Sequence, residues 1–289
     1  KTSNKKLTID LKVQNDIACP MYSGVCIQNV NIQASPKWLQ YKLRSIGLKP
    51  INNIVDITNF VLHETGHPLH AFDFNKIKDS KVIVRNAKKG EKIETLDSCV
   101  LELSDEDLII ADAEKPICLA GIIGGLNSAV DSQTKNIFLE SAFFDPTFIR
   151  KTAKRHSINS ESSYRFERGV DFNFSQFALQ RAAILIRDLC QGVISNEVLC
   201  DSKKLTLSCI DFSFKNCDKI LGFSIPENEM VNILVDLGFE IINQSKDGLK
   251  VLTPSYRCDV NREIDLVEEI ARIYGYDNLP TSNKISFQP

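Results

Sequence analysis

The first residues that could do chemistry form a histidine–glutamate–histidine motif. His63, Glu64 and His67 have the spacing HExxH, which zinc proteases use to place two histidine ligands one turn apart on one helix, with the glutamate as general base. Here Gly66 lies inside the motif and Pro68 follows it. Both residues favour a helix that ends at Gly66, so that His67 leaves the face carrying His63. The sequence therefore argues against a zinc site here.

A second group offers only carboxylate oxygens. Asp265, Glu268 and Glu269 share one face of a predicted helix, and Asp259 lies six residues before Asp265. Such oxygen ligands suit Mg²⁺. A solvated acidic face, with Glu268 paired to Arg272 at i,i+4, is the commoner meaning of this pattern. From the spacing alone we favour the solvated face.

Two further patterns are weak by themselves. The glycine-rich stretch 120–125 follows a predicted strand, but no Gly-Lys-Ser/Thr follows it, so it is not a P-loop. It predicts a tight turn, or a place where the main chain approaches a ligand closely. The other pattern is a basic stretch interleaved with aromatic residues, which suits RNA but is more often solvent-exposed charge. Its cations are Lys151, Lys154, Arg155, Arg165 and Arg168.

Composition limits the class of protein. The 289 residues suggest two domains at ~100–200 residues each. The formal charge of −2 excludes a strongly polybasic nucleic-acid binder and leaves room for a local basic patch. No uncharged apolar run approaches the ~20 residues of a membrane helix, and the polar N-terminus lacks a signal-peptide core. Because the chain begins at Lys1 rather than Met, we expect a piece of a longer protein.

Cysteine usage indicates the redox compartment. The nine cysteines include no CxxC pair, and several stand in apolar surroundings, such as Cys118 and Cys190. We expect buried, reduced thiols in a cytoplasmic protein.

Helices and strands must position these residues, and apolar periodicity predicts them. In the first part of the chain we expect helices over 36–46, 56–65, 145–155 and 174–190, and strands over 81–86, 100–103, 108–111 and 116–123. Asp56 and Asp145 would cap their helices. The apolar face of the helix over 174–190 would consist of Phe174, Phe177, Ala178, Ile184 and Leu185.

The pattern changes around Gly192. We expect a strand over 205–214, a helix over 227–237, a hairpin of 239–244 and 249–253, and a helix over 262–274. The apolar side of that last helix would carry Ile264, Val267, Ile270, Ala271 and Tyr274. The fold class is therefore α+β: a mixed β domain with flanking helices, then a small winged-helix-like α+β domain, with the boundary near 192–203.

Several long motifs, taken in order, resemble the β subunit family of bacterial phenylalanyl-tRNA synthetases. They are SPKWLQYKLRSIGLKPINNIVDITNFV, GHPLHAFD, LAGIIGG, LESAFFDPTFIRKTAKR, SYRFERGVD and PSYRCDVNREIDLVEEIARIYGYDNLP. The resemblance implies an editing domain over 1–195 and a winged-helix-like domain over 204–280. It also implies that the aminoacylating site lies on another chain, the α subunit.

The family's functional residues can be placed by motif. Thr58 and Asn59 match the editing pocket's Thr-Asn pair, and His70 matches the histidine of PLHAFD. Gly121 and Glu140 match residues that contact the amino acid. The sequence HETGH departs from many relatives, which have glutamine in place of His67.

The resemblance reverses the interpretation of the acidic helix. It implies that Asp259, Asp265, Glu268 and Glu269 are Mg²⁺ carboxylates at the interface with the α subunit. Without that subunit, we expect them to form a solvated acidic patch with Glu268 free to pair with Arg272, because close carboxylates repel one another.

The implied activity has two levels. The whole enzyme, two α and two β subunits, joins phenylalanine to tRNA(Phe) with ATP and Mg²⁺. This region hydrolyses mischarged Tyr-tRNA(Phe). A hydrophobic pocket rejects an isostere with an added hydroxyl only by ~10², so a second, hydrolytic site is required. A buried glutamate accepts the phenol proton of tyrosine and is left unpaired with phenylalanine.

Two other classes of function stay open. The chain could be a non-catalytic scaffold that docks tRNA, which incubation with Tyr-tRNA(Phe) would distinguish from a hydrolase. It could also be a DNA-binding winged-helix protein, which the near-neutral charge disfavours. None of these hypotheses involves a membrane.

Overall fold

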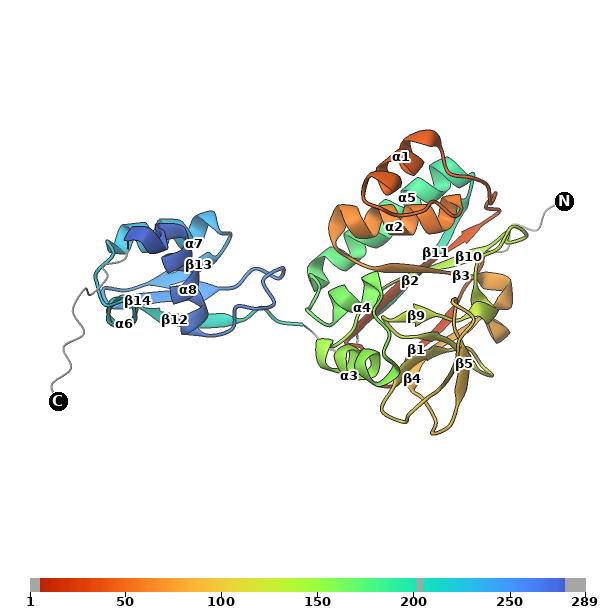
Figure 1. Ribbon diagram of the computed structural model, residues 1–289, viewed down its shortest axis with the longest axis horizontal. Helices are drawn as coiled ribbons and strands as arrows, with labels where there is room; N and C mark the ends of the chain where they lie inside the picture. Colours follow the sequence, from red (N-terminus) through yellow and green to blue (C-terminus); the bar gives the residue numbers. More distant parts are fainter. Residues whose placement is uncertain (1–5, 202–204, 279–289) are drawn as a thin grey trace, which may run out of the picture. The chain divides into compact units, whose positions relative to one another are not determined.

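The protein is described by a computed structural model that covers residues 6–201 and 205–278. It divides into two compact units, Lys1–Leu205 and Thr206–Pro289 (Figure 1). Each unit mixes helices with β-sheet, so the α+β class is confirmed. In the described part of the chain, no helix has the length and apolar character needed to cross a membrane.

Two sheets form the centre of the first unit. The five-stranded sheet has the order β1 (Asp10–Val13), β4 (Lys81–Asn86), β7 (Leu108–Ala111), β8 (Pro116–Leu119) and β9 (Ile123–Gly124). The four-stranded sheet has the order β11 (Val193–Asp201), β2 (Met21–Gln28), β10 (Ile137–Phe143) and β3 (Leu69–Asp73). A separate hairpin pairs β5 (Lys92–Glu94) with β6 (Val100–Glu102). Of these pairings only β1 with β4 is parallel in the described residues.

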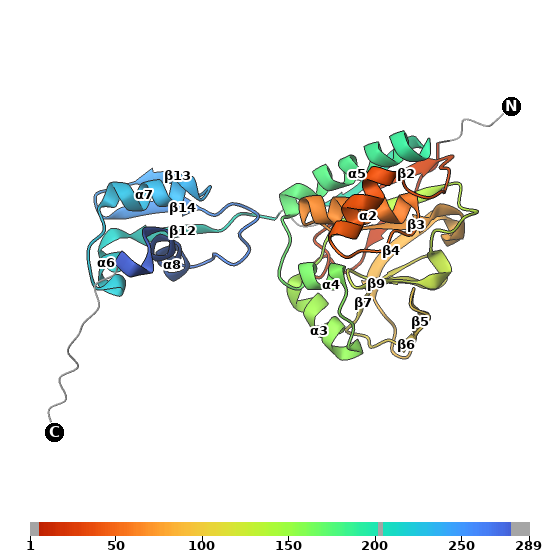
Figure 2. The same ribbon diagram turned by 45° about the horizontal axis from the view of Figure 1, so that its top comes forward.

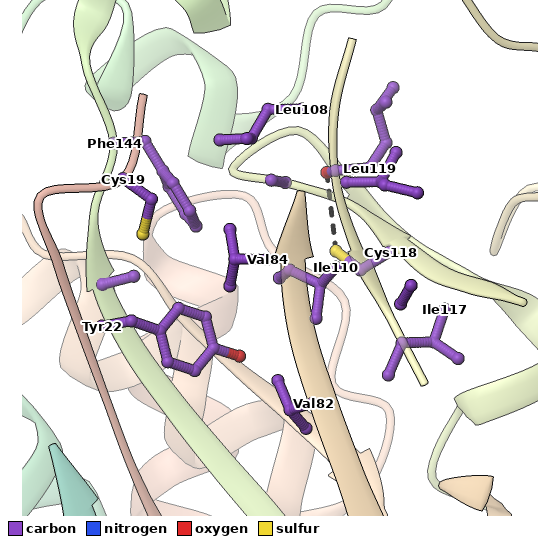
Figure 3. Packing of buried hydrophobic residues seen from close by; sticks show 14 of the residues in the cluster. Cys19, Tyr22, Val82, Val84, Leu108, Ile110, Ile117, Cys118, Leu119 and Phe144 are labelled. Carbon is purple, nitrogen blue, oxygen red and sulfur yellow. Dashed lines mark hydrogen bonds between the residues drawn. The ribbon is translucent and has the colours of Figure 1, made fainter. Parts of the chain in front are cut away.

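The four-stranded sheet is buried on both faces. From β2, Tyr22 and Cys26 join one hydrophobic cluster together with residues of the five-stranded sheet. Val25 and Ile27 join a second cluster on the other face, together with helix residues. Figure 3 shows Tyr22 reaching from β2 into the first cluster, toward Val82 of β4. Strands buried on both sides carry no alternation of apolar and polar residues, which explains why β2 and β10 escaped the sequence prediction.

The described residues of the first unit form five α-helices, and Figure 2 shows this unit from a second direction. They are α1 (Lys37–Ser45), α2 (Asn53–Thr65), α3 (Pro146–His156), α4 (Glu161–Phe166) and α5 (Ser175–Cys190). The Asp145 cap and Pro146 start of α3 confirm the sequence prediction. Short 3-10 turns cover Phe74–Lys76, Lys78–Ser80, Leu126–Ser128, Phe172–Phe174 and, in the second unit, Tyr276–Asn278.

The start of α2 differs from the prediction. Asn52, not Asp56, is the N-cap, and its side chain accepts hydrogen bonds from the backbone N–H groups of Ile54 and Val55 at 3.0 Å each. Asp56 lies inside the helix, fully buried, and accepts from the Ser35 hydroxyl and the Ile51 N–H. The helix ends at Gly66, whose φ of 75° is left-handed, as predicted.

The predicted apolar face of α5 was wrong in part. Phe174, Phe177 and Ile184 are exposed, whereas Leu179, Ala182, Ala183 and Ile186 are buried beside Ala178. Small alanine side chains let the helix backbone approach the sheet closely. Phe177 and Ile184 therefore face solvent, while Leu179 and Ile186 pack beside the alanines.

The second unit has its own core. Its sheet has the order β12 (Cys209–Ser213), β14 (Gly248–Leu252) and β13 (Glu240–Gln244), all antiparallel. Helices α6 (Phe214–Leu221), α7 (Glu227–Asp236) and α8 (Glu263–Tyr274) supply the rest of the core. The hairpin and helices α7 and α8 were predicted, and α6 was not. On α8, Ile264 is exposed and Leu266 and Glu269 are buried, so the predicted apolar face was shifted.

Candidate functional site

A cavity of about 80 Å³ brings together three of the predicted site residues. Glu140, His70 and Gly121 all line it, with Cys118 and Phe166 among their neighbours. The lining comes from β3, β8, β9, β10 and α4, which are far apart in the sequence. The fold therefore places the motif residues of three separate segments around one small space.

Glu140 occupies the middle of β10, opposite Gly24 of β2 and His70 of β3. Its side chain lies on the face that also carries Tyr22 and Phe138, toward the five-stranded sheet. The residue is 5% exposed. A carboxyl group at this depth needs a hydrogen-bond donor.

That donor is a tyrosine of the protein itself. The Tyr22 hydroxyl donates to Oε2 of Glu140 at 2.9 Å, and Tyr22 is fully buried. No other hydrogen bond reaches the Glu140 carboxyl from the described residues, so Oε1 is left for a further donor. Burial raises the pKa of Glu140 to about 8, against the opposing effect of the Tyr22 hydrogen bond.

His70 faces the same cavity from the edge strand β3. Its ring makes an edge-on contact with Phe72 at 4.5 Å between centroids, and its Nε2 is buried without a hydrogen-bond partner in the described residues. Burial lowers the pKa of His70 to about 4, so the imidazole is neutral near pH 7. A Cβ at position 124 would lie 2.5 Å from the ring carbon Cε1, so glycine there makes room for the histidine.

Gly121 sits in the turn between β8 and β9. Its φ of 67° is left-handed, and a Cβ there would lie 2.9 Å from Phe144 and 3.0 Å from Ile149. Glycine is the residue type that satisfies both conditions without strain. Glycine at position 121 therefore permits the close packing of this turn against Phe144, Ile149 and Phe166 beside the cavity.

Thr58 and Asn59 do not line this cavity. Both lie on α2, which packs on the opposite face of the four-stranded sheet, in the cluster of Ile57 and Leu139. The Thr58 hydroxyl is committed to the backbone oxygen of Val55 at 2.8 Å. The structure thus separates the predicted site residues into two groups, one on each side of the sheet.

The HExxH residues do not form a metal site. His67 lies beyond the end of α2 and is 1% exposed, and burial lowers its pKa to about 4. His63 is partly exposed and has Arg165 and Glu161 as neighbours. Within residues 6–201 and 205–278, no three His, Cys, Asp or Glu side chains are grouped for a metal ion.

The acidic residues of the second unit form the expected solvated patch only in part: Asp259 and Glu268 are exposed, but Glu269 is not. Glu269 is buried and bonds to Arg257 at 2.8 Å and to Arg272 at 2.7 Å. Arg272 thus pairs with Glu269 at i,i+3 and not with Glu268, because an inward-facing carboxylate requires a cation more than an exposed one does. Hydrogen bonds from Arg257 first and Arg272 second lower the pKa of Glu269 to about 2.

The other carboxylates of this group are also committed, except for the exposed Glu268. Asp259 bonds to Arg257 at 2.7 Å, and Asp265 accepts from the Arg262 side chain and from the backbone N–H groups of Asn261 and Arg262, just before α8. A guanidinium occupies the positions that a cation would take. As they stand, these four residues do not fit Mg²⁺.

Most of the basic stretch is neutralised by neighbouring acids. Arg155 bonds to Glu106 and to the buried Asp107, and Arg165 bonds to Glu161. Arg168 bonds to Glu167 and lies over the Tyr164 ring at 3.7 Å. Of the five cations of this stretch, Lys151 and Lys154 are exposed and have no ion pair with the described residues. Five cysteines are buried as expected, Cys19, Cys26, Cys118, Cys190 and Cys217, whereas Cys99, Cys209 and Cys258 are exposed, contrary to the expectation.

Fold and site together define an α+β protein of two units whose first unit encloses a small cavity with a buried acid and a neutral histidine. The B3/4 domain family model matches residues 18–191, and the tRNA synthetase B5 domain model matches residues 210–276. The chain belongs to the B3/4 domain family, in the form found in the β subunit of phenylalanine–tRNA ligases.

Two similar proteins are phenylalanine–tRNA ligase beta subunits. The chain is 43% identical over 286 residues to the phenylalanine–tRNA ligase beta subunit of Bacteroides thetaiotaomicron, covering 98% of this chain and 35% of that protein. It is 46% identical over 281 residues to that of Protochlamydia amoebophila, covering 96% and 34%. The chain thus spans about a third of these relatives' length, 34–35%.

A solved structure is also similar. It is an N-terminal fragment of the phenylalanyl-tRNA synthetase beta subunit of Pyrococcus horikoshii, with 16% identity and a TM-score of 0.44, covering 96% of this chain and 77% of that one.

Sequence reasoning missed Tyr22. Its partner Glu140 is 118 residues away, and no motif links the two. Only the pairing of β2 with β10 shows that Tyr22 lies beside Glu140.

Proposed function

We propose that this chain is the editing part of a phenylalanine–tRNA ligase β subunit, and that it hydrolyses Tyr-tRNA(Phe). Residues 1–195 are the editing domain, and 204–280 the winged-helix-like domain that follows it. One observation carries the proposal: Glu140, His70 and Gly121 line one cavity. Glu140 there already accepts a hydrogen bond from a phenol, that of Tyr22.

Selectivity follows from the burial of Glu140. Oε1, the carboxyl oxygen that Tyr22 leaves unused, can hydrogen-bond to a tyrosyl hydroxyl, as acceptor when Glu140 is ionised and as donor when it is protonated. A phenylalanyl ring in the same place removes water from the carboxyl group and offers no donor, which costs about 1–3 kcal/mol. The cavity therefore favours tyrosine by roughly tenfold to a hundredfold. This selectivity is of the same size as the ~10² by which a hydrophobic aminoacylating pocket discriminates against an added hydroxyl group.

Hydrolysis needs a water molecule near the ester. His70 is neutral, with one ring nitrogen unpartnered, so it can accept a hydrogen bond from water and direct it. Its low pKa makes it a weak base, so orientation is its main contribution. Thr58 and Asn59 lie on α2, outside the cavity, and are assigned to the tRNA end rather than to the amino acid.

The remaining roles belong to the whole enzyme. It joins phenylalanine to tRNA(Phe) with ATP and Mg²⁺ in the cytoplasm, and its aminoacylating site lies on the α subunit in an assembly of two α and two β chains. Asp259, Asp265, Glu268 and Glu269 are the Mg²⁺ carboxylates by motif. Since arginines hold three of them here, no step of the reaction is assigned to them.

The test is a substitution of Glu140 in the complete enzyme. Glu140→Ala should slow deacylation of Tyr-tRNA(Phe) by roughly tenfold or more, while charging with phenylalanine stays near normal. Ser141→Ala is the matched control, because its hydroxyl is also buried but bonds to Ser175 on the other face of β10. Unchanged deacylation in Glu140→Ala would favour the scaffold hypothesis instead.

A further inference from the structure

The first helix of the protein carries aromatic rings and positive charges on its exposed side. We infer that Lys37, Trp38, Tyr41, Lys42 and Arg44, here called the α1 face, form a docking surface for single-stranded RNA. The identification of that RNA as the unpaired end of tRNA(Phe) rests on the proposed function. The surface itself rests on the observations below.

The rings of the α1 face are unusually open. Trp38 is 42% exposed and Tyr41 is 63% exposed, although Leu39 and Leu43 of the same helix are buried. Positions three and four apart are neighbours on a helix, so Trp38, Tyr41 and Lys42 lie together. Trp38 is held edge-on by Phe60 of α2 at 5.6 Å between centroids. A fixed, exposed ring is a platform on which a base can stack.

The charge of this region has one sign. Residues 17–55 contain four cations, Lys37, Lys42, Arg44 and Lys49, and no Asp or Glu. None of the four has an ion pair in the described residues. This contrasts with the arginines near α3 and α4, which are paired with acids. Three of these four cations, Lys37, Lys42 and Arg44, lie on α1.

A groove continues the α1 face. A cavity of about 320 Å³ lies beside α1 and α2, lined by Lys42, Ile46, Phe60 and His63 among others. The acid in its lining, Glu64, is held by Arg181 through two hydrogen bonds of 2.9 and 3.0 Å, so it adds little negative potential. In Figure 1, α1 and α2 lie together at the surface of the first unit.

Charge and stacking together select the occupant. Aromatic rings between unpaired cations fit phosphates and bases, which offer negative charge and a flat face at short intervals. An apolar protein surface would leave the three cations of the α1 face without partners. The α1 face also lies on the same side of the sheet as Thr58 and Asn59, the residues assigned to the tRNA end.

Trp38 makes the test direct, because it is the only tryptophan in the chain. Uncharged tRNA(Phe) or a short oligoadenylate should quench its fluorescence, with an affinity that falls as salt is added. The double variant Lys42→Ala, Arg44→Ala should reduce the salt slope by about 1.4 if each cation neutralises one phosphate. Tyr41→Ala should weaken binding roughly tenfold and leave the reporter in place.

Matched controls remove equivalent groups elsewhere. Lys151→Ala with Lys154→Ala removes two exposed cations of α3, and Tyr276→Ala removes an exposed ring of the second unit. Both should bind RNA like the unmodified chain. Equal losses in these controls, or no quenching by either RNA, would overturn the inference. So would quenching by the α subunit or by anionic lipid vesicles in place of RNA.

The outcome is separable from that of the editing proposal. If Glu140→Ala stops deacylation while RNA leaves the Trp38 fluorescence unchanged, only the proposed docking surface is wrong. If Trp38 responds to RNA while Glu140→Ala deacylates normally, the editing assignment alone is wrong.

Discussion

At the scale of single residues, the Tyr22–Glu140 pair is the most informative feature. A buried carboxyl group favours its neutral form, and a hydrogen bond to the charged form opposes this effect. Tyr22 supplies that bond at 2.9 Å, while Cys19 and Cys118 are the other titratable groups that sense the Glu140 charge. The phenol of Tyr22 therefore favours the ionised form of Glu140, the group that is proposed to recognise the phenol of a tyrosyl substrate.

The first prediction concerns the charge of Glu140. Tyr22→Phe keeps the ring and removes the hydroxyl, so the pKa of Glu140 should rise above its present value of about 8. Carbon-13 NMR of the carboxyl group over a pH titration would measure this. Hydrolysis that depends on the ionised acid should shift to higher pH in the same direction.

Ser141→Ala serves as the control here too, since its hydroxyl bonds to Ser175. A Glu140 pKa that is unmoved in Tyr22→Phe would mean that burial alone determines it.

Motif matching could find Glu140, His70 and Gly121, because each stands in a recognisable stretch of sequence. It could not show that they share a cavity while Thr58 and Asn59 lie across the sheet. That division depends on which face of β3 and β10 each side chain takes. The register of the strands determines on which face of the sheet each side chain lies, and no local sequence pattern in this chain predicts that register.

At the scale of elements, local signals predicted best where one residue type has one physical meaning. Asp145 followed by Pro146 marks the start of α3, and Gly66 marks the end of α2. Predictions failed where tertiary packing decides. The apolar face of α5 is one case, because alanines were buried in preference to Phe177 and Ile184.

The second prediction separates two requirements for glycine. Gly121→Ala should destabilise the first unit more than Gly66→Ala does, although both glycines have left-handed φ, of 67° and 75°. At Gly66 nothing lies within 4 Å of an added Cβ, so only backbone strain of about 1 kcal/mol is expected. At Gly121 the rings of Phe144 and Phe166 would be overpacked, adding ~1–3 kcal/mol.

Denaturant unfolding of the two variants would measure the difference. Equal losses of stability would show that the turn between β8 and β9 relaxes away from Phe144. The cavity would then be more adaptable than its packing indicates.

At the scale of the whole molecule, each unit has its own hydrophobic core. From the sequence we expected the boundary near 192–203, and the structure divides the chain after residue 205. Strand β11 occupies most of that expected boundary region. It belongs to the first unit and pairs with β2, but its exposed residues gave no strand signal.

The last prediction concerns Mg²⁺ and the second unit. Because guanidinium groups hold Asp259, Asp265 and Glu269, the chain alone should bind Mg²⁺ only weakly in calorimetry. Arg257→Met releases Asp259 fully and leaves Glu269 with Arg272 as its partner. The loss of stability should stay below the ~3–5 kcal/mol of an uncompensated buried charge. Mg²⁺ should then bind more tightly, because two nearby carboxylates gain from a shared cation.

Arg262→Met, which removes only the side-chain cation of Asp265, is the matched control and should change Mg²⁺ affinity less. Micromolar affinity in the unmodified chain, lost in Asp265→Ala, would instead show that the arginines yield to the metal without the α subunit.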